Sequence, residues 1–176
     1  CGFPSSDVIA ALNERYDPSF IPGSEEGYIR LTTHNHIANS YNEQQLVMIE
    51  EESHFFDAVI EGNFPEYSYP TESRLELKKG AQIMFVKNDP SSEKRYFNGK
   101  IGIVTDFFEE YILVQCPDED EKIAVEQLEW ENCRYVINEQ TQEMETQVQG
   151  VFRQYPLRLA WAITIHKSQG LTFDRV

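Results

Sequence analysis

The segment that most constrains the fold is residues 157–165, which are almost continuously apolar. A strand with no polar face is buried on both sides, as in a parallel sheet covered by helices, so this run predicts an α/β core. A buried helix would show the same pattern, and the sequence leaves that alternative open. A membrane span takes about 18 apolar residues or more, so no membrane segment is expected in this chain.

A second α/β signal lies near the amino end, where a short β-rich strand is expected at residues 27–33. Residues 35–50 follow with apolar side chains at helical spacing, so a helix should begin directly after the strand. A strand followed at once by a helix is half of a βαβ unit. A further helix is expected at residues 6–16 and a further strand at residues 55–60.

The middle of the chain has a different character, with short β-forming runs separated by turn residues. Asn98 and Gly99 lie between β formers and predict a tight hairpin. Closely spaced strands of this kind predict a small antiparallel barrel of about 70 residues. The expected strands are residues 75–77, 83–86, 111–115, 122–125 and 131–136.

The predicted fold class is therefore α/β: a partial parallel sheet with helices, interrupted by a small antiparallel β-barrel. The α/β domain is assigned to residues 1–72 and 147–176, and the inserted barrel to residues 73–146. Residues 171–176 are expected to lead into one more strand of the parallel sheet.

The net charge of -15 argues against nucleic acid when it is taken alone, because binding to phosphates needs Lys and Arg. The acidic residues are concentrated, however, since residues 107–146 contain twelve acidic and two basic side chains. Residues 74–100 contain seven basic and three acidic side chains, and residues 151–176 contain four basic and one acidic. We interpret the acidic segment as a solvated face, while the two basic segments are compatible with phosphate binding.

The cysteines bear on the cellular compartment. Cys1, Cys116 and Cys133 are too few and too scattered for a disulfide framework, and their odd number fits a reducing cytoplasm. No pair of histidines stands at metal-ligand spacing with a cysteine, so no zinc site is expected. The chain has no signal peptide and begins without Met, so we expect it to be part of a longer protein.

A first polar segment stands where an α/β fold places its chemistry. Thr33, His34 and Asn35 fall at the junction of the first strand and its helix, and ligands bind beyond the carboxyl ends of strands in open α/β sheets. These side chains and the helix N-terminus can bind phosphate oxygens. The alternative is that Thr33 or Asn35 only caps the helix.

A second polar segment, residues 164–170, follows the buried apolar run. Lys167 can pair with a phosphate, and Thr164 and Ser168 supply hydroxyl groups. Gly170 allows the backbone to approach a ligand closely. The alternative is an ordinary surface loop that ends in a glycine turn.

Aromatic residues of the predicted barrel allow two interpretations. Exposed rings would offer a surface on which bases of a single strand can stack. Buried rings would fill the core of the barrel, which is the commoner use and the one we expect. The residues are Tyr96, Phe97, Phe107, Phe108, Tyr111 and Trp130.

Two features of a complete NTPase are absent from the sequence. It contains no G-x-x-x-x-G-K-[ST] phosphate loop. It also has no apolar strand that ends in paired acids to hold magnesium. The chain by itself is therefore expected not to hydrolyse ATP.

Four stretches of the sequence resemble superfamily-one helicases of the RecD and PIF types. Residues 31–35, with Ala38 and Asn42, resemble helicase motif IV. Residues 159–170, LAWAITIHKSQG, closely resemble motif V, which is the most specific of the matches. The segments between them, at residues 77–88 and 98–102, resemble the start of the SH3-like barrel that these helicases insert in their second RecA-like domain.

The resemblance implies the second RecA-like domain of an ATP-dependent DNA helicase with roles in DNA repair and recombination. The parent protein would use ATP and Mg²⁺, while this piece lacks the front RecA-like domain and the later motif whose arginine reaches the γ-phosphate. Its implied partners are that front domain and single-stranded DNA, which this piece alone would bind weakly. Gln169 and Gly170 would border the ATP cleft. The residues implied to contact DNA are Thr33, His34, Asn35, Thr164, His166, Lys167 and Ser168.

Two functions from different classes therefore stay in competition. The chain is expected to be part of a DNA helicase that grips single-stranded DNA and forms one wall of the ATP cleft. The alternative is a non-catalytic protein-interaction module derived from a helicase domain, in which the barrel and the acidic surface bind another protein.

Overall fold

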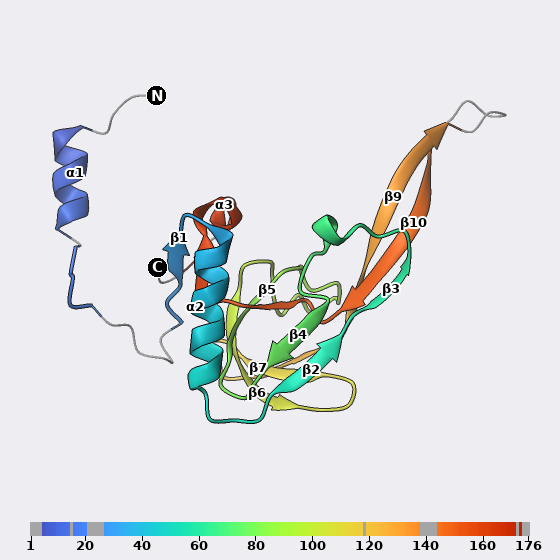
Figure 1. The fold of residues 1–176 in the computed structure, drawn as a ribbon, viewed down its shortest axis with the longest axis horizontal. Coiled ribbons are helices and arrows are strands. Elements are labelled where there is room, and N and C mark those ends of the chain that lie inside the picture. The colour runs from blue at the N-terminus through green and yellow to red at the C-terminus, as the bar shows by residue number, and fades with distance from the viewer. Residues whose placement is uncertain are drawn as a thin grey trace.

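The computed structural model describes residues 5–14, 16–20, 27–117, 119–137, 144–171 and 173 of the 176-residue chain. This part of the chain is mixed α/β structure, mostly strands with few helices (Figure 1). The helical elements are α1 (Ser6–Asn13), α2 (Asn35–Met48), the 3-10 turn η1 (Glu66–Ser68) and α3 (Ile165–Ser168). The strands are β1 (Arg30–Thr32), β2 (His54–Asp57), β3 (Val59–Gly62), β4 (Arg74–Leu77), β5 (Gln82–Phe85), β6 (Ile101–Phe107), β7 (Ile112–Gln115), β8 (Ile123–Val125), β9 (Leu128–Ile137), β10 (Met144–Gln154), β11 (Leu157–Leu159) and β12 (Ala162–Thr164).

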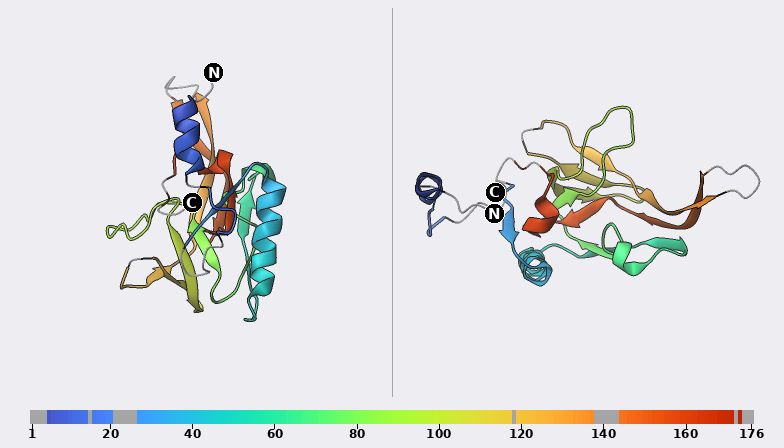
Figure 2. Two further views of the ribbon diagram at one scale, coloured as in Figure 1. Left: turned by 90° about the vertical axis from the view of Figure 1, so that its left-hand side faces the viewer. Right: turned by 90° about the horizontal axis from the view of Figure 1, so that it is seen from above.

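The α/β part is built from β1, β12 and α2. Strands β1 and β12 pair in parallel although they lie far apart in the sequence. Helix α2 buries Ala38, Asn42 and Leu46, which are four residues apart and so share one face, and it packs beside both strands (Figure 2). The expected strand and helix near the amino end are confirmed, but the parallel sheet of the described residues is small, with two strands.

The inserted segment forms an antiparallel sheet with the strand order β11-β5-β6-β7-β8. Its outer strands β11 and β8 are not paired with each other among the described residues, so no closed barrel is seen and the expectation of closure is corrected. A register shift between Val104 and Asp106 bends β6 where it pairs with β7. The predicted short strands in this segment are otherwise present, each within a few residues of its expected place.

The tight hairpin predicted at Asn98 and Gly99 is wrong. Strands β5 and β6 do pair, but a long loop joins them, and Gly99 lies near its end with a φ of 101°. The loop is held by Asp89, a buried carboxylate that accepts hydrogen bonds from the backbone N–H groups of Ser91 and Arg95. These bonds shape one turn of the loop. Asn98 and Gly99 form another, closed by the Lys100 N–H donating to the Phe97 carbonyl oxygen at 3.0 Å, but this turn does not join β5 directly to β6.

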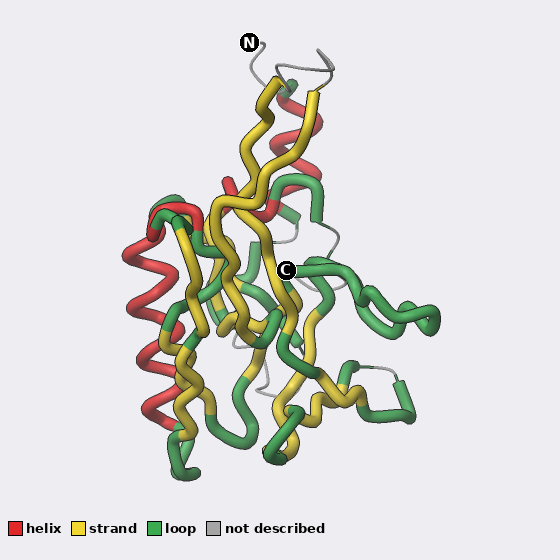
Figure 3. The backbone as a smooth tube through the Cα atoms, turned by 90° about the vertical axis from the view of Figure 1, so that its right-hand side faces the viewer, coloured by secondary structure: helices red, strands yellow, loops and turns green. Residues whose placement is uncertain are grey.

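Strands β9 and β10 form a long antiparallel hairpin that projects from the body (Figures 1 and 3). Strand β3 pairs with the inner part of β10, which gives the order β3-β10-β9. Strand β10 was not expected, and the single strand expected at residues 55–60 is two strands, β2 and β3. Three strand pairings cross the predicted domain boundaries at residues 72/73 and 146/147, namely β9–β10, β2–β4 and β11–β5. The domain assignment itself stays a prediction.

The apolar run at residues 157–165 is two strands in different sheets. Strand β11 pairs with β5 in the antiparallel sheet, and β12 pairs with β1 in the parallel pair. Only Ala160 and Trp161 lie between them, and Ala160 is fully buried. The open choice between strand and helix is thus settled in favour of strand up to Thr164, after which α3 begins. The strand expected at residues 171–176 falls mostly outside the described residues.

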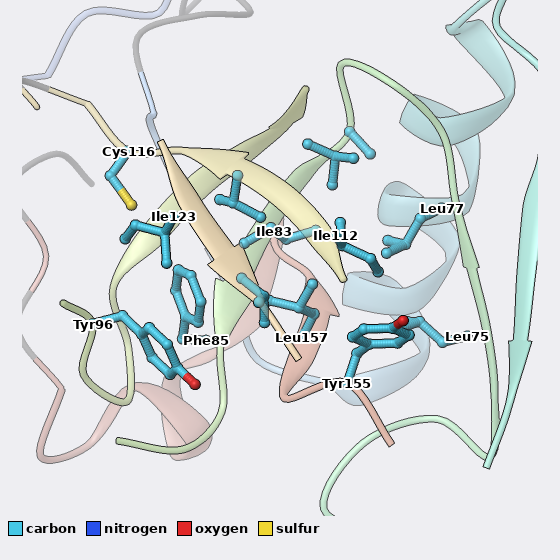
Figure 4. Packing of buried hydrophobic residues seen from close by; sticks show 14 of the residues in the cluster. Leu75, Leu77, Ile83, Phe85, Tyr96, Ile112, Cys116, Ile123, Tyr155 and Leu157 are labelled. Atoms are coloured by element: carbon cyan, nitrogen blue, oxygen red, sulfur yellow. The ribbon is translucent and has the colours of Figure 1, made fainter. Parts of the chain in front are cut away.

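The main core lies against the antiparallel sheet and is shared with α2 and β4 (Figure 4). Leu77, Ile83, Phe85, Ile112 and Leu157 are fully buried in it, each worth about 1.5–3 kcal/mol. A second apolar cluster lies between the antiparallel sheet and the parallel pair β1–β12. It contains Ile29, Met84, Ala160 and Ile163, with Val86, Ile101, Leu171 and Phe173 packed against it.

Helix α1 lies apart from the rest of the molecule (Figures 1 and 2). None of its residues is buried, and Val8, Ile9 and Leu12 are among its exposed apolar side chains. In the part of the chain that the structure describes, no helix has the length and apolar character needed to cross a membrane.

Candidate nucleic-acid interface

The two predicted polar segments meet at one edge of the parallel pair. Thr32 at the end of β1 is in register with Thr164 at the end of β12. Because the strands are parallel, the segments that follow them leave the sheet on the same side. The Thr32 hydroxyl lies 3.3 Å from the carbonyl oxygens of both His34 and Ile163, and its single proton can be donated to either of them, which links the two strand ends.

The first segment is exposed at the start of α2. Thr33, His34 and Asn35 are all accessible to solvent, and His34 is the N-cap residue of the helix. No side chain caps the helix, and the Thr33 hydroxyl lies 2.8 Å from His34 Nδ1. The helix has 14 residues, and its N-terminus carries the positive end of the helix dipole. The capping alternative is therefore not supported at Thr33 or Asn35.

The second segment forms the single helical turn α3. Thr164 is buried and is its N-cap, since the Thr164 Oγ1 accepts from the backbone N–H of Lys167 at 3.3 Å. The Ser168 hydroxyl donates to the carbonyl oxygen of Ile165 at 2.7 Å. Gly170 has a φ of 79°, a conformation that favours glycine. Both hydroxyl groups thus shape the turn.

The long side chains of the second segment remain available to a ligand. His166, Lys167 and Gln169 are exposed to solvent. Burial in its surroundings lowers the pKa of Lys167, and the nearby positive charge of Arg158 lowers it further, while Glu72 acts in the opposite direction. The structure therefore brings the predicted site residues of both segments to one edge, with Thr164 turned inward and the others accessible.

A cavity of about 250 Å³ opens beside this edge, between α2 and strands β4, β11 and β12. Asn35, Thr164 and Lys167 were predicted as site residues and line the cavity. The sequence reasoning missed Arg158 and Asn39, which also line it. A signal for Arg158 was present, since it is the charged residue within an otherwise apolar run.

Asn42 holds helix α2 against strand β12 next to this edge. It is buried on α2, and its side-chain amide bonds to the backbone of Ala162 and donates to the carbonyl oxygen of Leu159 at 3.4 Å. Gln82 acts similarly from β5, donating at 2.9 Å to the carbonyl oxygens of Tyr28 and Ala160. These two buried amides hold α2, the parallel pair and the antiparallel sheet in one arrangement.

The aromatic residues of the inserted segment divide between the two expected uses. Tyr96 is buried and stacks on Phe85 with ring centroids 4.2 Å apart, and burial raises its pKa to about 12. Phe97 and Phe108 are exposed, and Phe108 stacks on Tyr111. No group of three or more His, Cys, Asp or Glu side chains that could hold a metal ion occurs among the residues that the structure describes.

Comparisons with known proteins point in one direction. No family model matches the sequence. The ATP-dependent DNA helicase Pif1 of Bdellovibrio bacteriovorus is 32% identical over 142 residues, which cover 78% of this chain and 30% of the relative. The ATP-dependent DNA helicase Pif1 of Psychrobacter sp. is 30% identical over an alignment 216 positions long, gaps included. This alignment covers 97% of this chain and 32% of the relative.

Solved structures give the same family of neighbours. Bacteroides sp. Pif1 in complex with ADP-AlF4 matches with a TM-score of 0.85 and 38% identity, over 97% of this chain and 38% of that chain. Bacteroides Pif1 bound to ssDNA matches with a TM-score of 0.72 and 39% identity, with the same coverage of both chains. The chain spans about a third of the length of the relatives it matches.

Proposed function

We propose that this chain, which belongs to the Pif1 family of helicases, is part of an ATP-dependent DNA helicase. In that protein it would form one side of the track for single-stranded DNA and one wall of the ATP cleft. The observation that carries the proposal is the register of Thr32 with Thr164, which brings both polar segments to one edge. A single strand that runs along this edge would meet residues from both segments.

The proposed roles follow from exposure and chemistry. Thr33, His34 and Asn35 surround the start of α2, where a phosphate is favoured by the helix dipole. His166 and Lys167 present ring N–H and ammonium donors from α3 to the next phosphates. Thr164 and Ser168 keep α3 in place through their hydroxyl groups.

We assign Gln169 and Gly170 to the ATP side of the same edge, because they follow α3 directly and are exposed. ATP, with Mg²⁺, supplies the free energy of hydrolysis for movement along DNA, and its phosphate loop is assigned to the front RecA-like domain of the parent protein. This chain by itself is proposed not to hydrolyse ATP, since its sequence contains no such loop.

The front RecA-like domain is also the proposed partner of α1. The apolar face of this helix, with Val8, Ile9 and Leu12, has no cover within the described residues, and the relatives extend well beyond the part that this chain spans. We further propose that α2, β1, β12 and α3 belong to the second RecA-like domain, at residues 1–72 and 147–176. Strands β5, β6, β7 and β8 of the antiparallel sheet would then correspond to the SH3-like insert at residues 73–146, with β11 added to that sheet from the RecA-like part.

The proposal is tested by the fluorescence anisotropy of a labelled oligothymidylate mixed with the chain at low salt. Binding should weaken as the salt concentration rises, because phosphate contacts release counterions. The substitution Lys167→Ala should weaken it several-fold. The matched control Lys122→Ala, which removes the same charge from an exposed site in the acidic segment, should leave it unchanged.

A protein-interaction module is the second candidate, favoured by the outer part of the β9–β10 hairpin. Tyr135, Met144 and Val148 are exposed there on a ribbon that projects from the body (Figure 3). The same anisotropy titration separates the two functions. If the wild-type chain shows no salt-dependent binding of the oligonucleotide, the DNA role is contradicted and the interaction role is favoured.

A further inference from the structure

We propose that the cavity between α2 and the β11–β12 segment is a phosphate-binding site in which Arg158 is the principal ligand and Lys167 the second. The inference rests on the proposed function, because the phosphate that it would hold is one from the backbone of single-stranded DNA. It adds to that function a residue from the antiparallel sheet, outside the two polar segments.

The first argument is an unused donor on Arg158. The Nε–H group of this residue is buried and has no hydrogen-bond partner among the described residues. Its terminal nitrogen Nη2 makes only long contacts, at 3.4 Å to the carbonyl oxygen of Pro70 and 4.0 Å to the Glu72 carboxylate. Buried donors almost always have a partner, and leaving one unpaired costs about 1–3 kcal/mol. A small rotation of the guanidinium that turned Nε–H toward a ligand in the cavity would remove this cost.

The second argument is the closeness of two positive charges. Lys167 lines the same cavity as Arg158, and the positive charge of Arg158 disfavours the protonated form of the Lys167 amine. Glu72 is mostly exposed and reaches Arg158 only at 4.0 Å, so it neutralises this pair poorly. An anion between the two cations would relieve their repulsion and accept hydrogen bonds from both.

The other charges of the cavity do not supply that anion. Glu76 accepts a hydrogen bond from the Ser53 hydroxyl at 2.7 Å and is thereby directed to the β2–β4 side. Glu43 also lines the cavity but makes no ion pair with Arg158 or Lys167 among the described residues. Arg74, a third cation on the wall, lies 3.9 Å from the Asp57 carboxylate. Asn35 and Asn39 add side-chain amide donors from the start of α2.

The size of the cavity and its position favour a phosphate over a larger ligand. Its volume of about 250 Å³ lies below the range of about 300–1,000 Å³ that is usual for small-molecule pockets. The cavity shares Asn35, Thr164 and Lys167 with the proposed DNA edge, so a strand on that edge can direct one phosphate into it. The planar fork of a guanidinium matches two oxygens of one phosphate group.

The first test is the salt dependence of oligothymidylate binding by the full chain. Loss of one phosphate contact should lower the slope of log K against log salt concentration by about 0.7 for a single strand. We expect this change for Arg158→Gln. The matched control is Arg153→Gln, which removes the same charge from an exposed side chain paired with Glu129 on the hairpin sheet. Equal slopes for the two variants would overturn the site, while a persisting effect of Lys167→Ala would leave the proposed function standing.

The second test needs no variant and therefore does not depend on how Arg158→Gln folds. In proton–nitrogen NMR spectra, the Arg158 Nε–H resonance should shift when oligothymidylate, sodium phosphate or ATP is added in separate titrations. A shift at the lowest concentration with the oligonucleotide supports a backbone phosphate, and one with ATP would replace it by a nucleotide phosphate. A shift with sodium phosphate alone keeps the site and removes its DNA role. No shift with any of the three overturns the site.

Discussion

The side-chain amide of Asn42 pairs with both backbone polar groups of Ala162, as a neighbouring strand would. Its Oδ1 accepts from the Ala162 N–H at 2.8 Å, and its Nδ2 donates to the Ala162 carbonyl oxygen at 2.9 Å. Asn42 lies on α2 and Ala162 begins β12, so this pair fixes the helix to the strand that leads into α3. This buried amide thus adds to the parallel pairing of β1 and β12 in fixing the relative position of the two polar segments.

We expect Asn42→Ala to lower the free energy of unfolding by roughly 2–4 kcal/mol, since it leaves two buried backbone groups without partners. Urea denaturation followed by circular dichroism measures this change. Asn39→Ala is the matched control, because Asn39 is exposed on the same helix, and its effect should stay within about 0.5 kcal/mol. Equal losses for both variants would contradict the role given to Asn42.

Gly102 is a position where packing excludes any side chain. A methyl group there would overlap Val114 and would lie 3.2 Å from the Gln115 carbonyl oxygen, on the neighbouring strand β7. Gly102→Ala should therefore destabilise the protein by about 1–3 kcal/mol. In a double-mutant cycle the added cost should be smaller when Val114 is already replaced by Ala. Additive effects would show that the contact with Val114 is not the cause.

Thr164 is expected to act on DNA binding through the position of α3. Thr164→Val keeps the shape of the side chain and removes the N-cap acceptor, at a cost of about 1 kcal/mol. Hydrogen exchange at the backbone N–H of Lys167 should become faster, and oligothymidylate binding should weaken. Thr164→Ser retains the acceptor and should restore both properties. If Thr164→Val alters binding without changing that exchange, the capping explanation is wrong.

The loop between β5 and β6 should make stability depend on pH in acid. Burial by itself raises the pKa of Asp89, but the hydrogen bonds from Ser91 and Arg95, with the Arg95 charge, outweigh it and leave the pKa below the usual 3.8. A carboxyl whose pKa is lower in the folded state stabilises that state above pH 3.8, and the contribution is lost as the pH falls from there through the folded-state pKa.

Asp89→Asn should therefore flatten the acid limb of the stability–pH profile, when the free energy of unfolding is measured by urea denaturation at several pH values. Asp7→Asn on the exposed helix α1 serves as the control and should leave the profile as in the wild type. An unchanged acid limb in Asp89→Asn would mean that other carboxylates, such as Asp106 beside Lys79, carry the dependence.

Periodicity predicted the parts of the fold in which one face of an element is buried. The helix expected at residues 35–50 is α2, because Ala38 and Leu46 recur on the face that packs against the strands. The two-residue hairpin expected at Asn98 and Gly99 was wrong because their turn lies inside a longer loop, which the Asp89 carboxylate holds by accepting from the backbone N–H groups of Ser91 and Arg95. Closure of the barrel depends on long-range pairing, which the sequence pattern does not specify.

The sequence predicted part of the arrangement at this edge for a similar reason, while the roles of its residues stay a prediction. The polar residues after each apolar run were visible in the sequence, and the parallel register brings them together. Arg158 and Asn42 were not assigned to the site, because their importance comes from which segments lie across from them in space. A charged residue inside an apolar run, and an amide on the buried face of a helix, are the signals that would have found them.

The joint at Ala160 and Trp161 has a mechanical consequence for the whole edge. Because only two residues link β11 to β12, a tilt of the antiparallel sheet relative to the parallel pair cannot be absorbed by the link and must move β12. The strain passes straight to Thr164, and through its hydroxyl to the turn that carries Lys167. A change in the angle between the antiparallel sheet and the parallel pair would therefore change the orientation of the exposed side chains of α3.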